Sequence, residues 1–330
     1  MYLKQLYTNI IKKKDSWNYY GLEIACLDIS NSESCRNFIK EYIQLSGKSK
    51  HAMYREIDEL FEKDPQRITH IVSTFFFGMA LLNNQRFGIE QAIISGIEKL
   101  KVFDSEDKIK SELPYIWFLA TLFHDLGYNA EKSEEGTELP CFLPETNIVF
   151  VPQFYTGVYK KYYEYRKNKE HGIYGGIRFI QDMFNIRKSN EHNIMSNRYW
   201  GKELEKIYSN VGWIIISHNI WFKSRDELYN GDYAEMQELV LDDDKDYKIK
   251  FEEYPLFFFF CIVDVLEPTK HTTIFSKVNI TLENRKIIIS TNDKAYSKAI
   301  MGLNKWLTPV EKDGEKLIID FNCKEIDTYK

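Results

Sequence analysis

The sequence predicts a mainly α-helical fold with a small α+β appendage at its C-terminal end. Apolar residues recur at three- and four-residue spacing through much of the first 275 positions, which is the pattern of one buried helix face. After about Ser276 the pattern changes to the alternation that is typical of strands. The chain has 330 residues, 44% of them hydrophobic and 15% aromatic, which is enough for a large aromatic-rich core. We expect a helical extension over 1–62, a main helical domain over 63–275 and an α+β subdomain over 276–330.

Helix-start signals predict where helices begin in the N-terminal half. Asp64-Pro65 predicts a helix start, because Asp is a favoured N-cap and Pro is favoured at the first helical position. Pro114 predicts the start of a later helix, and Gly127 predicts its end. The helices expected in this half cover residues 37–45, 54–61, 65–82, 88–100 and 115–125.

Two irregular insertions interrupt the C-terminal half. Residues 129–160 contain three prolines and few periodic apolar residues, and residues 230–254 are polar and acidic. The helices expected around them cover 162–183, 200–222 and a segment opened by Pro255. Beyond these we expect a β-hairpin over 278–290, a helix over 294–306 and a strand over 316–321.

Composition excludes several classes of protein. The net charge of −5 argues against bulk binding to nucleic acid. The five cysteines are odd in number and form no CxxC pair, which predicts neither a disulfide framework nor a thiolate zinc site. The N-terminus lacks the apolar stretch of a signal peptide, and the most apolar run, 256–263, is too short to span a membrane. We therefore expect a cytoplasmic protein that does not bind membranes.

Histidine and aspartate residues in apolar helices are the strongest functional signal. Four of the seven histidines and two aspartates lie within or at the ends of strongly apolar segments. Burying a carboxylate among Phe, Ile and Val is costly unless a cation or strong hydrogen bonds compensate it. Imidazole and carboxylate together suit Mn, Fe, Ni, Co or Zn, so we expect a divalent transition-metal site. The six candidate ligands are His70, His124, Asp125, His171, His218 and Asp264.

The order of these residues resembles the HD-domain superfamily of helical metal-dependent phosphohydrolases. The resemblance lies in the adjacent His-Asp pair of "LFHDLGY", in "EHGIYGG" and in "PLFFFFCIVDVLEP", and it covers roughly residues 65–270. It implies an HD-domain helical bundle with two metal ions. Asp125 would bridge them, with His70, His124 and Asp264 on one ion and His171 and His218 on the other.

The resemblance also implies an activity. Metal-bound hydroxide would hydrolyse a nucleotide or another small phosphoester, with Asp125 at the catalytic centre, so the enzyme would be a phosphomonoesterase, a phosphodiesterase or a nucleotide hydrolase. The marks of individual branches, such as a Gly-Tyr-Pro triplet, are absent, which leaves the branch open. Two alternatives stay open on the same ligands: an HD-type diiron oxygenase, and a non-catalytic regulatory module with a structural metal.

Further candidates surround the six ligands. Arg67 shares a helix face with His70, and a run of cations and tyrosines precedes His171, so both could contact a substrate phosphate or could be solvated helix faces. Glu170 could support a ligand, act as a general base or supply helix N-terminal charge, and Glu267 has the same ambiguity. The substrate-binding candidates are Arg67, Lys161, Arg166, Lys169 and His271. The oligomeric state stays open.

Overall fold

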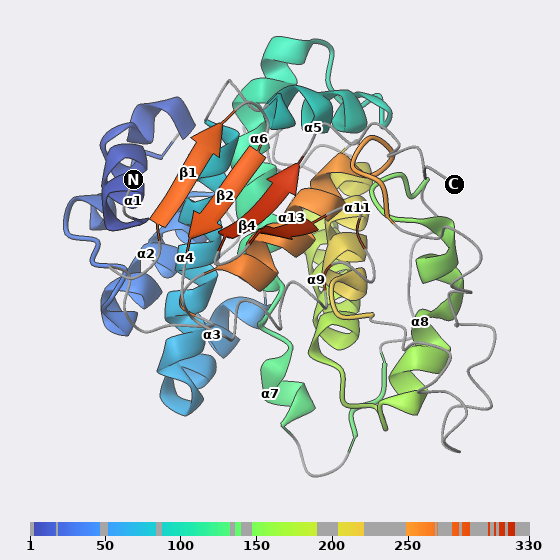
Figure 1. Cartoon of the computed structure of the whole chain (residues 1–330). Helices are drawn as coiled ribbons and strands as arrows, with labels where there is room; N and C mark the ends of the chain where they lie inside the picture. Colours follow the sequence, from blue (N-terminus) through green and yellow to red (C-terminus); the bar gives the residue numbers. More distant parts are fainter. Residues whose placement is uncertain are drawn as a thin grey trace, which may run out of the picture.

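A computed structural model of the chain shows a mainly helical molecule, as predicted (Figure 1). Within the described residues no helix is both long enough and apolar enough to cross a membrane. The structure describes residues 3–17, 19–46, 52–83, 88–132, 136–139, 147–189, 204–220, 249–267, 269, 279–283, 286–290, 303, 307, 310–313 and 316–320.

Three N-terminal helices pack against the long helix α4 (Pro65–Leu82). Helix α2 begins before the predicted segment because the side chain of Asn31 accepts a hydrogen bond from the backbone N–H of Ser34. Phe38 of α2 and Phe75 of α4 meet around Trp17, so the extension and α4 share one aromatic core. The boundary expected near residue 62 stays a prediction. The three helices are α1 (Leu3–Lys12), α2 (Ser32–Leu45) and α3 (Ala52–Lys63).

The start of α4 is confirmed, whereas the start predicted for α6 is wrong. Asp64 caps α4 by accepting from the N–H of Arg67, with Pro65 in the first turn. Helix α6 runs over Glu106–Phe123 and contains Pro114 in its interior. Ser105 accepts from the N–H of Lys108, and acidic residues in the first turn favour the early start. Helix α5 (Ile89–Glu98) precedes α6, and α13 (Pro255–Leu266) begins at the predicted proline.

Two helices overlap the insertion that was predicted to be irregular over 129–160. They are α7 (Tyr128–Glu131) and α8 (Gln153–Tyr165), so helix returns earlier than expected. Three tyrosines of α8, Tyr155, Tyr162 and Tyr163, are buried, so packing contributes to the stability of this helix. Most of the second insertion, 230–254, lies outside the described residues.

The single helix expected over 162–183 is two helices. Helix α8 ends at Tyr165, and α9 (His171–Ser189) begins after a turn in which Lys167 and Asn168 adopt left-handed backbone conformations, both with φ of 56°. This turn redirects the chain so that His171 opens α9. Helix α9 packs closely on α11 (Leu204–Ser217), where a Cβ atom at Gly176 would lie 2.7 Å from the carbonyl oxygen of Gly212.

The C-terminal part contains a four-stranded antiparallel sheet with strand order β1-β2-β4-β3. The predicted hairpin is confirmed, with Ile280 opposite Ile289, and so is the last predicted strand. One strand, β3, was not predicted. The helix predicted over 294–306 lies outside the described residues, apart from Leu303. The strands are β1 (Asn279–Glu283), β2 (Lys286–Ser290), β3 (Val310–Asp313) and β4 (Lys316–Asp320).

Candidate metal centre

Five helices bring the six predicted ligands together in the protein interior. Helices α4 and α13 contribute residues from their length, α6 and α11 contribute residues just beyond their last turn, and α9 contributes its first residue. All six side chains are buried, and they form two groups of three. Within each group the ligand atoms lie within 4.8 Å of one another. The first triad is His70, His124 and Asp264, and the second triad is Asp125, His171 and His218.

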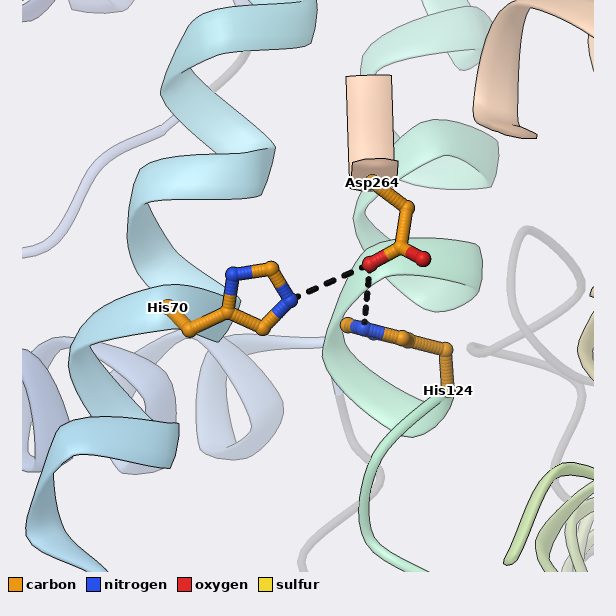
Figure 2. A group of neighbouring side chains, drawn as sticks. All are labelled: His70, His124 and Asp264. Carbon is orange, nitrogen blue, oxygen red and sulfur yellow. Dashed lines mark hydrogen bonds and ion pairs between the residues drawn. The ribbon is translucent and has the colours of Figure 1, made fainter. Parts of the chain in front are cut away.

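In the first triad two imidazoles face one carboxylate oxygen (Figure 2). Oδ1 of Asp264 lies 3.1 Å from Nε2 of His70 and 3.3 Å from Nε2 of His124. His70 comes from α4 and His124 from the end of α6, so the triad joins three helices that are distant in sequence.

The second triad lies next to the first, and Asp125 connects the two. Oδ1 of Asp125 is 3.3 Å from Nε2 of His124 and 3.4 Å from Nε2 of His171. The rings of His171 and His218 have centroids 5.2 Å apart, and those of His124 and His218 are 5.3 Å apart. Asp125 is therefore the carboxylate that borders both triads.

Backbone carbonyls orient two of the four imidazoles. Nδ1 of His124 lies 2.7 Å from the carbonyl oxygen of Thr121, and Nδ1 of His218 lies 2.6 Å from that of Ile215. Because a carbonyl oxygen only accepts, each Nδ1 carries the proton and donates it. In the neutral rings of His124 and His218 the lone pair is then on Nε2, the nitrogen that metals bind.

Carboxylates orient the other two imidazoles in the same way. His70 donates from Nδ1 to Oε2 of Glu267 over 2.8 Å, and His171 donates from Nδ1 to Oε2 of Glu131. Nε2 of His171 also lies 2.6 Å from Nδ2 of Asn219. Such outer partners fix the tautomer and the ring orientation of metal-binding histidines.

The first triad contains a conflict that a cation resolves. Nε2 of His124 is buried and has no hydrogen-bond partner among the described residues, although Oδ1 atoms of Asp125 and Asp264 lie 3.3 Å away. A lone pair facing two carboxylate oxygens is repulsive unless a positive charge lies between them. A metal ion bound to Nε2 satisfies all three groups at once, so the donor set fits a divalent transition metal.

The electrostatics of the second triad keep its carboxylate ionised and one of its imidazoles neutral. Burial raises the pKa of Asp125, but His124 and Arg67 outweigh burial and hold that pKa well below its usual range. Burial lowers the pKa of His171, yet hydrogen bonds with Asp125 and Glu131 reverse this and raise it to about 9. Burial and the neighbouring His171 and His124 lower the pKa of His218 to about 3, which keeps that ring neutral.

Arg67 and Tyr128 cover one side of this centre. Nη1 of Arg67 lies 3.0 Å from Oδ2 of Asp125, and the guanidinium carbon lies 4.0 Å from the centre of the Tyr128 ring. That ring stacks on His171 with centroids 3.8 Å apart and planes 19° from parallel. Because the Arg67 side chain is 22% exposed, the stack connects the buried centre to solvent.

The other predicted candidates are Glu170, three cations near it in sequence, and His271. Glu170 is buried and accepts from the N–H of Ile173, so it caps α9. Lys161 and Arg166 are exposed and Lys169 is half-buried, and the charge of Arg166 contributes to lowering the pKa of Glu131. His271 lies outside the described residues. Substrate contacts by these cations stay a prediction.

The sequence did not point to Glu131 or Tyr128. Both lie on the short helix α7, inside a segment without apolar periodicity, so no local pattern marks them. Glu267 was considered because it follows Asp264 by three positions and so shares a helix face, but its contact with His70 was not foreseen.

Comparisons of the chain with protein-family models, with curated proteins and with solved structures found no match. What can be inferred about function therefore depends on the motifs and on the geometry of the two triads.

Proposed function

We propose that this protein is a metal-dependent phosphohydrolase of the HD-domain type, with two divalent transition-metal ions in the two triads. One observation carries the proposal: imidazole Nε2 atoms and carboxylate oxygens converge in two adjacent buried groups, and Nε2 of His124 is left without a hydrogen-bond partner among the described residues. A structural core histidine would have both nitrogens satisfied.

The residues divide between the two ions according to the triads. His70, His124 and Asp264 would hold one ion, and His171 and His218 the other, with Asp125 between them because its Oδ1 atom faces both His124 and His171. Manganese, iron, nickel, cobalt and zinc all suit this mixture of imidazole and carboxylate. When bound, such ions would supply Lewis acidity for a phosphoryl oxygen and for activating a water at neutral pH.

The surrounding side chains would bind and orient the substrate. Arg67 offers a guanidinium to an anionic phosphoryl group. Guanidinium groups bind phosphate through bidentate hydrogen bonds. Tyr128 keeps its proton, because burial and the charge of Asp125 raise the pKa of its hydroxyl. Phe260 packs against the rings of His124 and His218 and excludes water from that side. A small phosphoester or nucleotide is the substrate class that this arrangement suits.

Metal reconstitution tests the proposal. Protein loaded separately with each of Mn, Fe, Ni, Co and Zn should hydrolyse at least one member of a panel of nucleotides and phosphomonoesters. Asp125→Asn should abolish this hydrolysis, whereas the same substitution at the more exposed Asp58, which pairs with Lys40, should leave it unchanged.

Two results would overturn the proposal. Dioxygen uptake by iron-loaded protein without phosphate release would identify a diiron oxygenase. Tight binding of two metals with no turnover of any substrate would identify a regulatory module.

A further inference from the structure

A chain of hydrogen bonds connects the N-terminal helix α1 to the first triad. It runs from Tyr7 of α1 to Ser73 of α4, then to Glu267 just after α13, and then to His70. Only His70 belongs to the ligand set. The other three residues lie behind it and contact neither carboxylate of the triads in any described hydrogen bond.

Glu267 is the centre of this chain. It is fully buried, at 0% exposure, and both of its oxygens accept hydrogen bonds. Oε2 accepts from Nδ1 of His70 at 2.8 Å and from the hydroxyl of Thr269. Oε1 accepts from the hydroxyl of Ser73 and from the N–H of Thr269 at 2.8 Å. Four donors fill the acceptor positions of one carboxylate, which fixes its position and gives a buried charge the partners that it requires.

The direction of the hydrogen bonds follows from the carboxylate of Glu267, which only accepts. Ser73 has one hydroxyl proton and donates it to Glu267, so its oxygen accepts from the hydroxyl of Tyr7 at 2.8 Å. Tyr7 is itself buried and packs on Phe76, so α1 must be docked for this bond to form.

We propose that Glu267 is a positioning residue for the first metal ion, and that Tyr7 couples the docking of α1 to the position of Glu267. Glu267 holds the proton of His70 on Nδ1 and aims Nε2 at Asp264. Tyr7 and Ser73 hold Glu267 in place. The N-terminal helix thereby affects the metal affinity of a site to which it contributes no ligand. This inference rests on the metal centre of the proposed function, and not on the reaction it catalyses.

Metal binding to single-site backgrounds tests the proposal. His218→Ala removes a ligand of the second triad and leaves the first, and Asp264→Ala does the reverse. In the His218→Ala background, Glu267→Gln should weaken Co²⁺ binding, measured by calorimetry and by visible absorption, by about 10- to 100-fold, the usual effect of losing an outer partner. In the Asp264→Ala background it should leave Co²⁺ affinity unchanged.

Glu131→Gln is the matched control, because it removes the carboxylate partner of His171 in the second triad. It should give the opposite pattern, with weaker binding in the Asp264→Ala background only. Tyr7→Phe should weaken first-site binding by less than Glu267→Gln does, and Tyr42→Phe, which removes a hydroxyl from the nearby aromatic cluster, should not change it. Glu267→Asp should recover part of the affinity.

The outcomes separate this inference from the proposed function. If the unmodified protein binds no transition metal, the metal centre itself is wrong. If it binds two ions and Glu267→Gln leaves first-site affinity unchanged, or weakens both sites equally, the positioning role is overturned and the metal centre stands. If Glu267→Gln does not fold, unchanged first-site affinity in Tyr7→Phe and Glu267→Asp overturns the inference.

Discussion

Nη1 of Arg67 lies 3.0 Å from Oδ2 of Asp125, the carboxylate that borders both triads. The two side chains differ in exposure, because Arg67 keeps 22% of its surface accessible and Asp125 only 2%. Under the proposed function, a cation that contacts the buried centre on one side and solvent on the other would meet an anionic substrate. The first prediction follows from this contact.

Arg67→Ala should raise the KM for a phosphoester by about 10- to 100-fold, since a hydrogen bond to a charged group contributes about 1.5–3 kcal/mol. Steady-state kinetics on metal-loaded protein measure this. Arg36→Ala is the control, because Arg36 is similarly exposed, at 25%, but pairs with Glu33 and Asp58 away from the triads. An unchanged KM in Arg67→Ala would contradict the assignment of Arg67 to substrate binding.

Removing the metal should destabilise the protein. An ion present at 100 times its dissociation constant stabilises the folded state by about 2.7 kcal/mol, so a chelator should lower Tm by several degrees. Differential scanning fluorimetry with and without added Mn²⁺ or Zn²⁺ measures the shift. His124→Ala, which removes the histidine whose Nε2 lacks a hydrogen-bond partner, should shrink it. A chelator that leaves the Tm of the metal-loaded protein unchanged would count against a bound ion.

Gly172→Ala should disrupt the second triad. A Cβ atom at this position would lie 2.8 Å from Cε1 of His218 and 2.8 Å from the carbonyl oxygen of Ile215, and that carbonyl orients His218. We expect lower stability and weaker binding of the second ion, measured by thermal melts and by metal analysis. Gly157→Ala on α8 is the matched control: its Cβ would meet nothing within 4 Å, and Ala should stabilise that helix by about 0.5–1 kcal/mol. Equal effects of the two substitutions would refute this reasoning.

Phe38→Ala should destabilise the whole helical body and not only the N-terminal extension. Phe38 packs on Trp17, Phe75 and Phe76, and truncating a buried Phe costs about 3–5 kcal/mol. Because α2 and α4 share this cluster, tryptophan fluorescence and circular dichroism should report one shared transition at a lower denaturant concentration. Two separated transitions would instead support an independent extension over 1–62.

Local signals in the sequence were sufficient for most of the helical framework. Asp64-Pro65 and Pro255 gave two helix starts correctly, because capping and the fixed φ of proline act within a few residues. Pro114 misled for the same reason. Its effect on a helix start is local, whereas the cap at Ser105 and the packing of α6 hold that proline inside a longer helix. The sequence also did not predict the break between α8 and α9, because two non-glycine residues in left-handed conformation leave no sequence pattern.

The six candidate ligands were identifiable from the sequence alone, because imidazoles and carboxylates in apolar helices need partners wherever the helices pack. Their grouping into two triads, the role of Glu131 and the link from Tyr7 to His70 depended on the tertiary structure. His70 and Glu267, for example, are 197 positions apart and meet only because α4 and α13 pack together. The sequence determined which buried side chains could hold a metal ion, and only the fold decided how they are grouped, because hydrogen bonds and metal coordination depend on distances that no local pattern encodes.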